Sequence, residues 1–380
     1  MRFEDIKTPA YVIDEKKLRS NLKILGDLQT ISGARILLAQ KAYSVYQTYP
    51  LVAEYLSGAT ASGLFEARLA HEELKGLENH VFEPAYRDGE MEELCHICDH
   101  MVFNSLLQLE HHRPVWEKHV HEGSLSVGLR INPEFSTQEG HEIYDPCARG
   151  SRLGIRLENM PEKLPYGVEG LHFHTLCEQG FEPLKDTFKV VEEKFSKYFS
   201  QIKWINLGGG HHITRDDYDV AGLTELILYI RNTYGLEVYL EPGEAIALDA
   251  GYLVTTVMDI VDTQGLPALI LDASAACHMP DVLEMPYRPP LRDGEEPGEL
   301  EHTYRLSSRT CLAGDIIGDY SFSEEKKIGD RLVFEDMAIY SMVKNNTFNG
   351  MPLPDIDILR ENGEVEVIKS FGYDDFKMRL

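Results

Sequence analysis

The sequence lacks any long hydrophobic run and any excess of positive charge. No apolar stretch reaches the roughly 18 residues of a transmembrane helix, so none is expected. The opening segment, MRFEDIKTPAYVIDEKKL, has no basic stretch followed by an apolar one, and a secretory signal is not expected either. Acidic residues outnumber basic ones 63 to 37, giving a formal net charge of −26. A surface of that charge repels nucleic acids and anionic membranes, which argues against both as partners.

Cysteine is also sparse, with six residues spread over 380. Scattered thiols in a long chain predict reduced cysteines and a cytoplasmic protein. Cys95 and Cys98 form one CxxC pair without a second half, which favours two small buried residues on a helix over a zinc or redox site. The hydrophobic content of 43% is typical of a globular protein with a large core.

The first two thirds of the chain contain a regular alternation of strand-like and helix-like segments. Short apolar runs alternate with polar segments of helical period, such as 44–56, 65–74 and 182–199. The candidate strands are 36–42, 58–63, 80–83, 100–104, 126–132, 168–174, 203–207 and 237–241. Eight such repeats predict an α/β fold, a closed (β/α)8 TIM barrel, rather than an open doubly wound sheet. The second run, GATASG, is the weakest strand candidate because it has little apolar content.

The pattern changes after residue 246. Segments such as GYLVTTVMDIVDT and DRLVFEDMAIYSMV predict strands joined by turns, with little helix. The opening TPAYVID is strand-like and is expected to pair with them. We therefore predict a barrel domain over residues 14–246 and a mostly β domain, sandwich-like or barrel-like, from residues 1–13 and 247–380. The segment 286–303 is rich in Pro, Gly and acids, which indicates a surface loop.

Unusual residues occur at the carboxyl ends of the predicted barrel strands, where such barrels hold their catalytic groups. Lys41 ends the first strand. Desolvation would make its amine a nucleophile able to form a Schiff base, or the side chain simply extends to solvent, and both interpretations stay open. His172 and His174 end the sixth strand and can face one side. They suit metal ligation, completed by His211 and His212, or an imidazole stacked on a flat cofactor.

A glycine run and a carboxylate follow the last two strands. Gly208, Gly209 and Gly210 can expose consecutive amide N–H groups to an anion. Glu241 ends the eighth strand, where a carboxylate can hold a protonated ring nitrogen. A lysine, a stacking histidine, a phosphate cradle and a carboxylate together meet the four needs of pyridoxal 5′-phosphate. A metallohydrolase is an alternative, but it leaves Lys41 and the glycines unexplained.

These motifs, in this order, resemble those of the fold-type III pyridoxal-phosphate decarboxylases over nearly the whole chain. The resemblance implies that Lys41 of AQKAY binds the cofactor covalently and that His174 of HFHTLCE stacks on its ring. It implies that Glu241 of EPGEA pairs with the pyridine nitrogen and that Gly208 to Gly210 form the phosphate loop. Cys177 stands where several members have a phosphate-binding serine.

Three further positions match the family. Arg152 of SRLGI corresponds to a basic residue of the active site, and Tyr340 to a tyrosine near the phosphate. Cys311 of TCLAGD corresponds to a cysteine contributed across the interface of a homodimer with shared active sites. The resemblance also makes Cys311 the candidate for protonating the substrate carbanion.

Departures from the family pattern indicate a subgroup. Glu244 replaces the arginine of the usual EPGR motif, and Leu312 rather than an acid follows the cysteine. With HMPD and KNNTFNG, these variants resemble the carboxynorspermidine (carboxyspermidine) decarboxylases. That resemblance implies loss of CO2 from a cationic carboxy-polyamine in spermidine or norspermidine biosynthesis. A diaminopimelate, ornithine or arginine decarboxylase of the same fold, and a pyridoxal-phosphate racemase, remain alternatives.

A polyamine substrate needs acids rather than a carboxylate-binding arginine at its far end. Glu244, Asp272 and Asp315 are the candidates, because each gains from pairing with a desolvated amine. His278 of HMPD is expected to join Asp272 in facing the site from across a dimer. No metal ligand set is predicted.

Overall fold

The structure, a computed structural model, describes residues 3–138 and 142–380 and divides into two compact units. One unit runs from Asn21 to Ile246, and the other joins the N-terminal segment through Ser20 with Ala247–Leu380. The predicted boundary after residue 246 coincides with this division. The first boundary falls inside helix α1 (Glu15–Ser32), later than the predicted position after residue 13.

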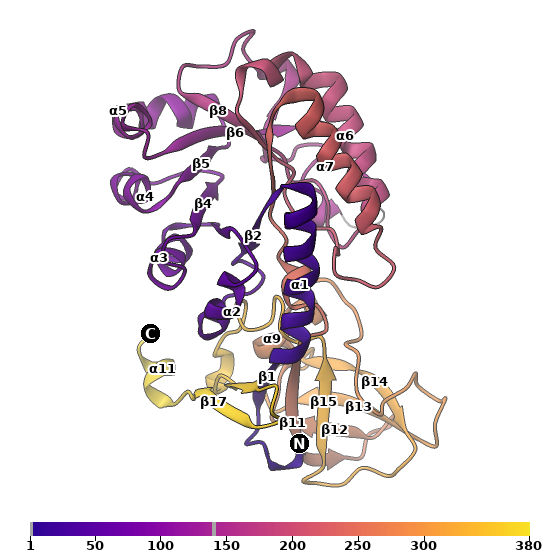
Figure 1. The fold of residues 1–380 in the computed structure, drawn as a ribbon. Coiled ribbons are helices and arrows are strands. Elements are labelled where there is room, and N and C mark those ends of the chain that lie inside the picture. The colour runs from indigo at the N-terminus through magenta and orange to yellow at the C-terminus, as the bar shows by residue number, and fades with distance from the viewer. Residues whose placement is uncertain (1–2, 139–141) are drawn as a thin grey trace. The chain divides into compact units, whose positions relative to one another are not determined.

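The unit Asn21–Ile246 is a closed barrel of eight parallel strands with helices outside it (Figure 1). Its strands are, in barrel order, β2 (Arg35–Ala39), β3 (Gly58–Ala61), β4 (Glu78–Glu83), β5 (His100–Phe103), β6 (Ser126–Asn132), β8 (Val168–His172), β9 (Trp204–Asn206) and β10 (Glu237–Leu240). Pairing of β10 with β2 closes the ring. The predicted (β/α)8 barrel is confirmed, including its weakest strand, and the open sheet is wrong.

Helices connect most of these strands. They are α2 (Tyr49–Ala53), α3 (Leu64–Glu73), α4 (Met91–Ile97), α5 (Leu106–Glu122), α6 (Phe181–Phe195) and α7 (Val220–Tyr234), and the short α8 (Glu244–Ala247) follows the last strand. Helix α5 begins after Ser105, whose side chain accepts a hydrogen bond from the Gln108 amide, and ends at Gly123 in the left-handed conformation. Between β6 and β8 lie a short strand, β7 (Ile155–Arg156), and two 3-10 turns, Glu142–Tyr144 and Leu157–Asn159.

Large rings fill the barrel interior near the amino ends of its strands. Trp204 of β9 stacks on His100 with ring centroids 4.8 Å apart, and His100 stacks on His80 at 4.0 Å. A Cβ at Gly128 or Gly170 would lie 2.3 or 2.0 Å from the Trp204 ring, so only glycine fits beside it. Burial lowers the pKa of His80 to about 3, which keeps that imidazole neutral. Because side chains fill the barrel interior near the amino ends, a reaction site inside the barrel is expected at the carboxyl ends of its strands.

The other unit is mostly β, as predicted. Its strands are β1 (Ala10–Asp14), β11 (Gly251–Val261), β12 (Ala268–Leu271), β13 (His302–Ser308), β14 (Ile316–Phe322), β15 (Arg331–Glu335), β16 (Asp355–Leu359) and β17 (Val365–Lys369). Strand β1, from TPAYVID, pairs antiparallel with β11 and parallel with β16, which confirms its expected place. Short helices are α9 (Ala275–His278), α10 (Asp281–Glu284) and α11 (Tyr373–Lys377). Across the described part of the chain, no helix combines the length and the apolar character needed to span a bilayer.

Candidate active site at the carboxyl ends of the barrel strands

Lys41 lies two residues beyond the end of β2, in a turn rather than on the strand. Its side chain reaches solvent, yet the surrounding protein partly desolvates the ammonium group. That desolvation, together with the positive charge of Arg130, lowers the pKa of Lys41. Glu241, Glu244 and Cys177 oppose the shift, which places all three within electrostatic reach of the amine. A lowered pKa increases the fraction of the neutral, nucleophilic amine.

Glu241 follows β10 directly and is held inside the barrel by two hydrogen bonds. Nε2 of His172, at the end of β8, lies 3.1 Å from Oε2, and Nδ2 of Asn206, at the end of β9, donates to Oε1 at 2.8 Å. Burial by itself raises the pKa of Glu241, but its electrostatic interaction and hydrogen bond with His172, followed by its interactions with His80 and Asn206, outweigh burial and lower the pKa. Glu241 is therefore a carboxylate, the form that pairs with a protonated ring nitrogen.

His172 is a neutral donor in this arrangement. Burial lowers its pKa, although Glu241 acts in the opposite direction. With the Nε2 proton directed at Glu241, the buried Nδ1 has no hydrogen-bond partner in the residues that the structure describes. Phe82 of β4 stacks on the imidazole at 5.6 Å, which fixes the plane of the ring.

His174 lies two residues beyond β8 and is oriented by the glycine loop. The Gly209 amide donates to its Nδ1 at 3.0 Å. Burial and the charge of Lys41 hold the pKa of His174 well below its usual range. The ring is therefore neutral, with its proton on Nε2. A neutral imidazole can lie against a flat cofactor without placing a second cation beside Lys41.

The glycine loop packs directly against its neighbours. A Cβ at Gly209 would lie 2.1 Å from the carbonyl oxygen of Glu241, and one at Gly210 would lie 1.9 Å from that of Leu176. The Gly208 amide donates to Oδ1 of Asn206 at 2.8 Å. The loops after the sixth, seventh and eighth barrel strands therefore meet here, at the position where barrels commonly bind phosphate. Two of the three predicted phosphate donors, the amides of Gly208 and Gly209, already serve Asn206 and His174.

Glu244, predicted as a substrate ligand, pairs with His212 in the structure. Its Oε2 lies 2.9 Å from Nε2 of His212, and the side chains are 13% and 12% exposed. Burial alone lowers the pKa of His212, but the hydrogen bond and charge of Glu244 raise it above its ordinary value. The sequence analysis missed this pair because its members lie 32 residues apart, one in the loop after β9 and the other at the start of helix α8.

The four histidines considered as an alternative metal set have separate partners. His172 faces Glu241, His174 faces Gly209, His212 faces Glu244, and Nδ1 of His211 lies 2.6 Å from the Tyr218 hydroxyl. Within residues 3–138 and 142–380, the groups able to hold a metal are found elsewhere, around helices α4 and α5. They are Asp88 with His111 and His112, and Glu92 with His96 and His119.

Arg130 of β6 is a site residue that the sequence analysis missed. It is 5% exposed, and its Nη2 donates to the His174 carbonyl at 3.0 Å. Burial lowers its pKa to about 10, so the guanidinium stays charged at neutral pH. A buried arginine near the end of an apolar run was the same signal that selected Lys41. Arg152, the predicted basic residue, is exposed, accepts a hydrogen bond from Asn104 through its carbonyl, and contributes to the lowered pKa of Arg130.

Five predicted residues belong to the other unit, and the carboxylates of two of them, Asp272 and Asp315, accept hydrogen bonds there. Asp272 accepts hydrogen bonds from Oγ1 of Thr8 at 2.6 Å and from the Thr256 amide at 2.8 Å. Asp315 accepts from Oγ of Ser274 at 2.7 Å and from Oγ1 of Thr310 at 2.6 Å. Their recognition of substrate stays a prediction.

His278, Cys311 and Tyr340 differ in exposure. His278 is fully buried, and its Nε2 lies 3.0 Å from the carbonyl oxygen of Pro352. Burial lowers the pKa of His278 to about 4. Cys311 is exposed, and its amide donates to Oδ1 of Asn349 at 2.7 Å. Tyr340 is half-buried with a φ of 50°, a left-handed conformation unusual for tyrosine. The predicted functions of these three residues remain predictions.

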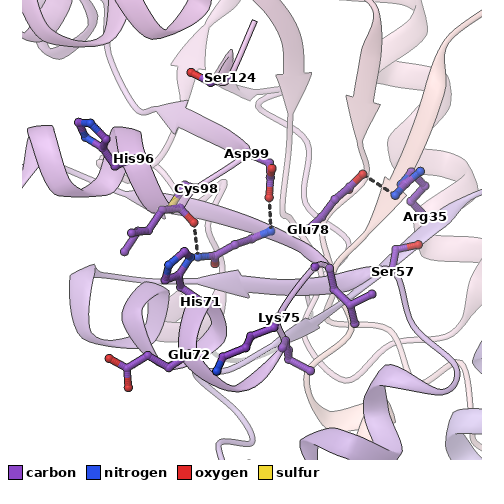
Figure 2. Close-up of a pocket in the computed structure, with 15 residues that line it drawn as sticks. Arg35, Ser57, His71, Glu72, Lys75, Glu78, His96, Cys98, Asp99 and Ser124 are labelled. Carbon is purple, nitrogen blue, oxygen red and sulfur yellow. Dashed lines mark hydrogen bonds and ion pairs between the residues drawn. The ribbon is translucent and has the colours of Figure 1, made fainter.

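A cavity of about 770 Å³ lies at the opposite, amino ends of the strands (Figure 2). Arg35 and Glu78, which begin β2 and β4, form an ion pair of 2.5 Å in its wall. Asp99, just before β5, accepts a hydrogen bond from the Asn79 amide. None of the predicted site residues lines this cavity, so it is distinct from the arrangement around Lys41 and Glu241.

Comparisons with known proteins agree with this geometry. The family described as pyridoxal-dependent decarboxylase, C-terminal sheet domain, matches residues 10–338. A carboxynorspermidine/carboxyspermidine decarboxylase of Campylobacter jejuni is 42% identical over 390 residues, covering 100% of both chains. A carboxyaminopropylagmatine decarboxylase of Synechocystis sp. is 40% identical over 381 residues, covering 100% of this chain and 97% of the other.

A solved structure shows the same fold. The carboxynorspermidine decarboxylase of Campylobacter jejuni, complexed with norspermidine, superposes with a TM-score of 0.91 at 40% identity and covers 99% of this chain and 100% of its own. A diaminopimelate decarboxylase of Helicobacter pylori shares the fold at a TM-score of 0.84 with 18% identity. Lys41, Glu241, His174 and the glycine loop fit pyridoxal phosphate, since they supply a desolvated amine, an ionised carboxylate, a neutral ring and a side-chain-free loop. The chain belongs to the pyridoxal-dependent decarboxylase family.

Proposed function

We propose that this protein decarboxylates carboxynorspermidine and carboxyspermidine, releasing CO2 with norspermidine or spermidine, as a step of polyamine biosynthesis. The observation that carries the proposal is the full-length identity of 42% with a decarboxylase named for these two substrates. A related structure of the same fold, at 40% identity, holds norspermidine, which is the amine that carboxynorspermidine becomes when it loses CO2.

The barrel residues support this reaction as a set. Lys41 would bind pyridoxal phosphate, Glu241 would keep a proton on its ring nitrogen, and His174 would lie against its ring. When bound, the cofactor supplies an electron-accepting ring for the charge left on the substrate carbon as the bond to CO2 breaks. Glu241 can keep that proton in place because hydrogen bonds from His172 and Asn206 fix the position of its carboxylate. Arg130 adds a fixed positive charge beside His174.

The remaining site residues complete the proposal. Arg152, Cys177, the glycine loop and Tyr340 are proposed for the cofactor, and Glu244, Asp272, His278 and Asp315 for the cationic substrate. Cys311 of a second subunit would return a proton to the substrate carbon, so we propose a homodimer with shared sites. A cytoplasmic location agrees with the six cysteines, which form no disulfide in the described chain.

Carboxyaminopropylagmatine is a second candidate substrate, because a relative named for it is 40% identical over the whole chain. That substrate ends in a planar guanidinium group, whereas the carboxy-polyamines end in a primary amine. A guanidinium donates two parallel hydrogen bonds to one carboxylate in a fixed geometry, while an ammonium group donates to carboxylates in several directions. The diaminopimelate decarboxylases are more distant, at 24% identity over 95% of this chain for that of Staphylococcus aureus.

CO2 release from a panel of substrates tests the proposal. The panel contains carboxynorspermidine, carboxyspermidine, carboxyaminopropylagmatine, diaminopimelate, ornithine, arginine and lysine, each with added pyridoxal phosphate. We expect the highest kcat/KM for the two carboxy-polyamines. A preference for carboxyaminopropylagmatine would select the second candidate, and racemisation without CO2 would overturn decarboxylation altogether.

A matched pair of lysine variants shows whether the barrel site performs the reaction. Lys41→Ala should abolish turnover, since it removes the amine that binds the cofactor. Lys75→Ala, an exposed lysine at the amino-end cavity, should leave kcat and KM unchanged. Near-normal turnover by Lys41→Ala would contradict the proposed site.

A further inference from the structure

We infer that His212, oriented by Glu244, binds the phosphate of the cofactor in this protein. The inference rests on the proposed function, since it requires pyridoxal phosphate in the barrel. It gives Glu244 a function other than the substrate acid predicted from the sequence, and it gives His212 a function other than the metal ligation considered there as an alternative.

The position of the pair supports a phosphate contact. His212 lies two residues after the glycine loop that follows β9, and Glu244 begins helix α8, four residues after the end of β10. Barrels commonly build their phosphate site from the loops after the seventh and eighth strands, and here these strands are β9 and β10. The 2.9 Å bond between Nε2 and Oε2 therefore joins the two loops expected to surround the phosphate.

The orientation of the imidazole leaves one nitrogen for a ligand. Nε2 faces Glu244, and Nδ1 has no hydrogen-bond partner in the described ranges of the chain. A protonated imidazole donates from both nitrogens, so His212 can serve Glu244 and an anion at once. A carboxylate on the far nitrogen is a common way to fix the ring and tautomer of a histidine that binds a ligand.

The charges around His212 favour its protonated form. Glu244 and Glu178 stabilise the imidazolium, while Arg215 and the neighbouring His211 oppose it. The balance raises the pKa of His212, and the ring is charged over a wider pH range than a free histidine.

The site needs this cation for two reasons. Glu244 brings a negative charge close to the glycine loop, and an unpaired carboxylate there would repel a phosphate dianion. The amides of Gly208 and Gly209 already donate within the protein, which leaves fewer backbone donors for the phosphate. A charged His212 neutralises Glu244 and supplies a charge-assisted hydrogen bond.

The test compares pyridoxal phosphate with pyridoxal, which lacks the phosphate. Apoprotein prepared from the holoenzyme is titrated with each compound, and binding is followed by absorbance. His212→Gln removes the charge and keeps a hydrogen-bonding side chain. Glu244→Gln keeps the shape and removes the carboxylate that raises the histidine pKa. Lys189→Gln is the control, since Lys189 is an exposed cation of helix α6 that pairs with Asp186 and is not among the groups that shift the pKa of His212.

We expect His212→Gln to weaken pyridoxal phosphate binding by roughly 10- to 100-fold and to leave pyridoxal binding unchanged. In the wild type, affinity for pyridoxal phosphate should fall as pH rises through the pKa of His212, and in Glu244→Gln this fall should occur at lower pH. The ³¹P resonance of the holoenzyme should follow the same titration. Lys189→Gln should bind both compounds like the wild type.

Three results would overturn the inference. One is equal loss of both affinities in His212→Gln, which marks a structural effect. Another is that His212→Gln binds pyridoxal phosphate and pyridoxal as tightly as the wild type. The third is that Glu244→Gln changes only the KM for substrate. If His212→Gln does not fold, the inference is tested by Glu244→Gln alone, through the pH at which its affinity for pyridoxal phosphate falls. Failure of the wild type to bind pyridoxal phosphate would instead refute the proposed function itself.

Discussion

Replacement of Gly209 by alanine tests the close approach on which the barrel site depends. Gly209 has a φ that alanine can adopt, unlike Gly208 and Gly210 with φ of 72° and 82°. The substitution therefore adds one methyl group without backbone strain. That methyl would lie 2.1 Å from the Glu241 carbonyl oxygen, where ordinary contact begins at 3.4 Å, so the two loops must separate by about 1.3 Å.

The cost has two parts. Overpacking of this kind destabilises a protein by about 1–3 kcal/mol. A displacement of Glu241 also stretches its bonds to His172 and Asn206, now 3.1 and 2.8 Å long, and bonds to a charged group contribute about 1.5–3 kcal/mol each. We expect Gly209→Ala to lose about 1–3 kcal/mol of stability and to bind pyridoxal phosphate at least about tenfold more weakly.

Tryptophan fluorescence during urea unfolding measures the loss of stability of the barrel unit. Both tryptophans, Trp116 and Trp204, lie in the barrel unit. Gly180→Ala is the matched control, because Gly180 has a φ of −87° and a Cβ there would meet nothing within 4 Å. The reasoning is refuted if Gly209→Ala unfolds at the same urea concentration as Gly180→Ala and retains wild-type cofactor affinity.

Two further predictions concern a buried acid and an exposed thiol. Glu83 ends β4 with a buried Oε1 that has no partner in the described chain, and burial raises its pKa to about 7. A raised carboxyl pKa lowers stability as pH rises from the unfolded value toward the folded one, and the penalty is fully present above about pH 7. Glu83→Gln should therefore raise the urea midpoint at pH 8 and change it little at pH 4, and equal shifts at both pH values would contradict this assignment. Cys311→Ser should lower kcat by about 100-fold or more with little change in cofactor affinity, because a proton donor is removed; full turnover in steady-state assays would show that another group donates the proton.

The sequence by itself determined the barrel and most of its strand ends. The alternation of short apolar runs with helical segments is local, and each run corresponds to a strand of the structure. Even GATASG forms a strand, β3. Its low apolar content has a structural reason at Gly58, where a Cβ would lie 1.9 Å from the Glu78 carbonyl oxygen, a spacing that only glycine tolerates. Residues just beyond strand ends, such as Lys41 and Glu241, could be selected because a charge beside a buried strand requires a reason.

Tertiary structure alone decided which of these residues act together. The bond of Glu244 to His212 and the bonds of Glu241 to His172 and Asn206 cross between loops that no local pattern relates. Arg130 belongs to the site because β6 pairs with β8, and this pairing brings the Arg130 guanidinium to the His174 carbonyl. Strand formation depends on near neighbours in the chain, whereas hydrogen-bond partners and pKa values depend on segments that only the closed barrel brings together.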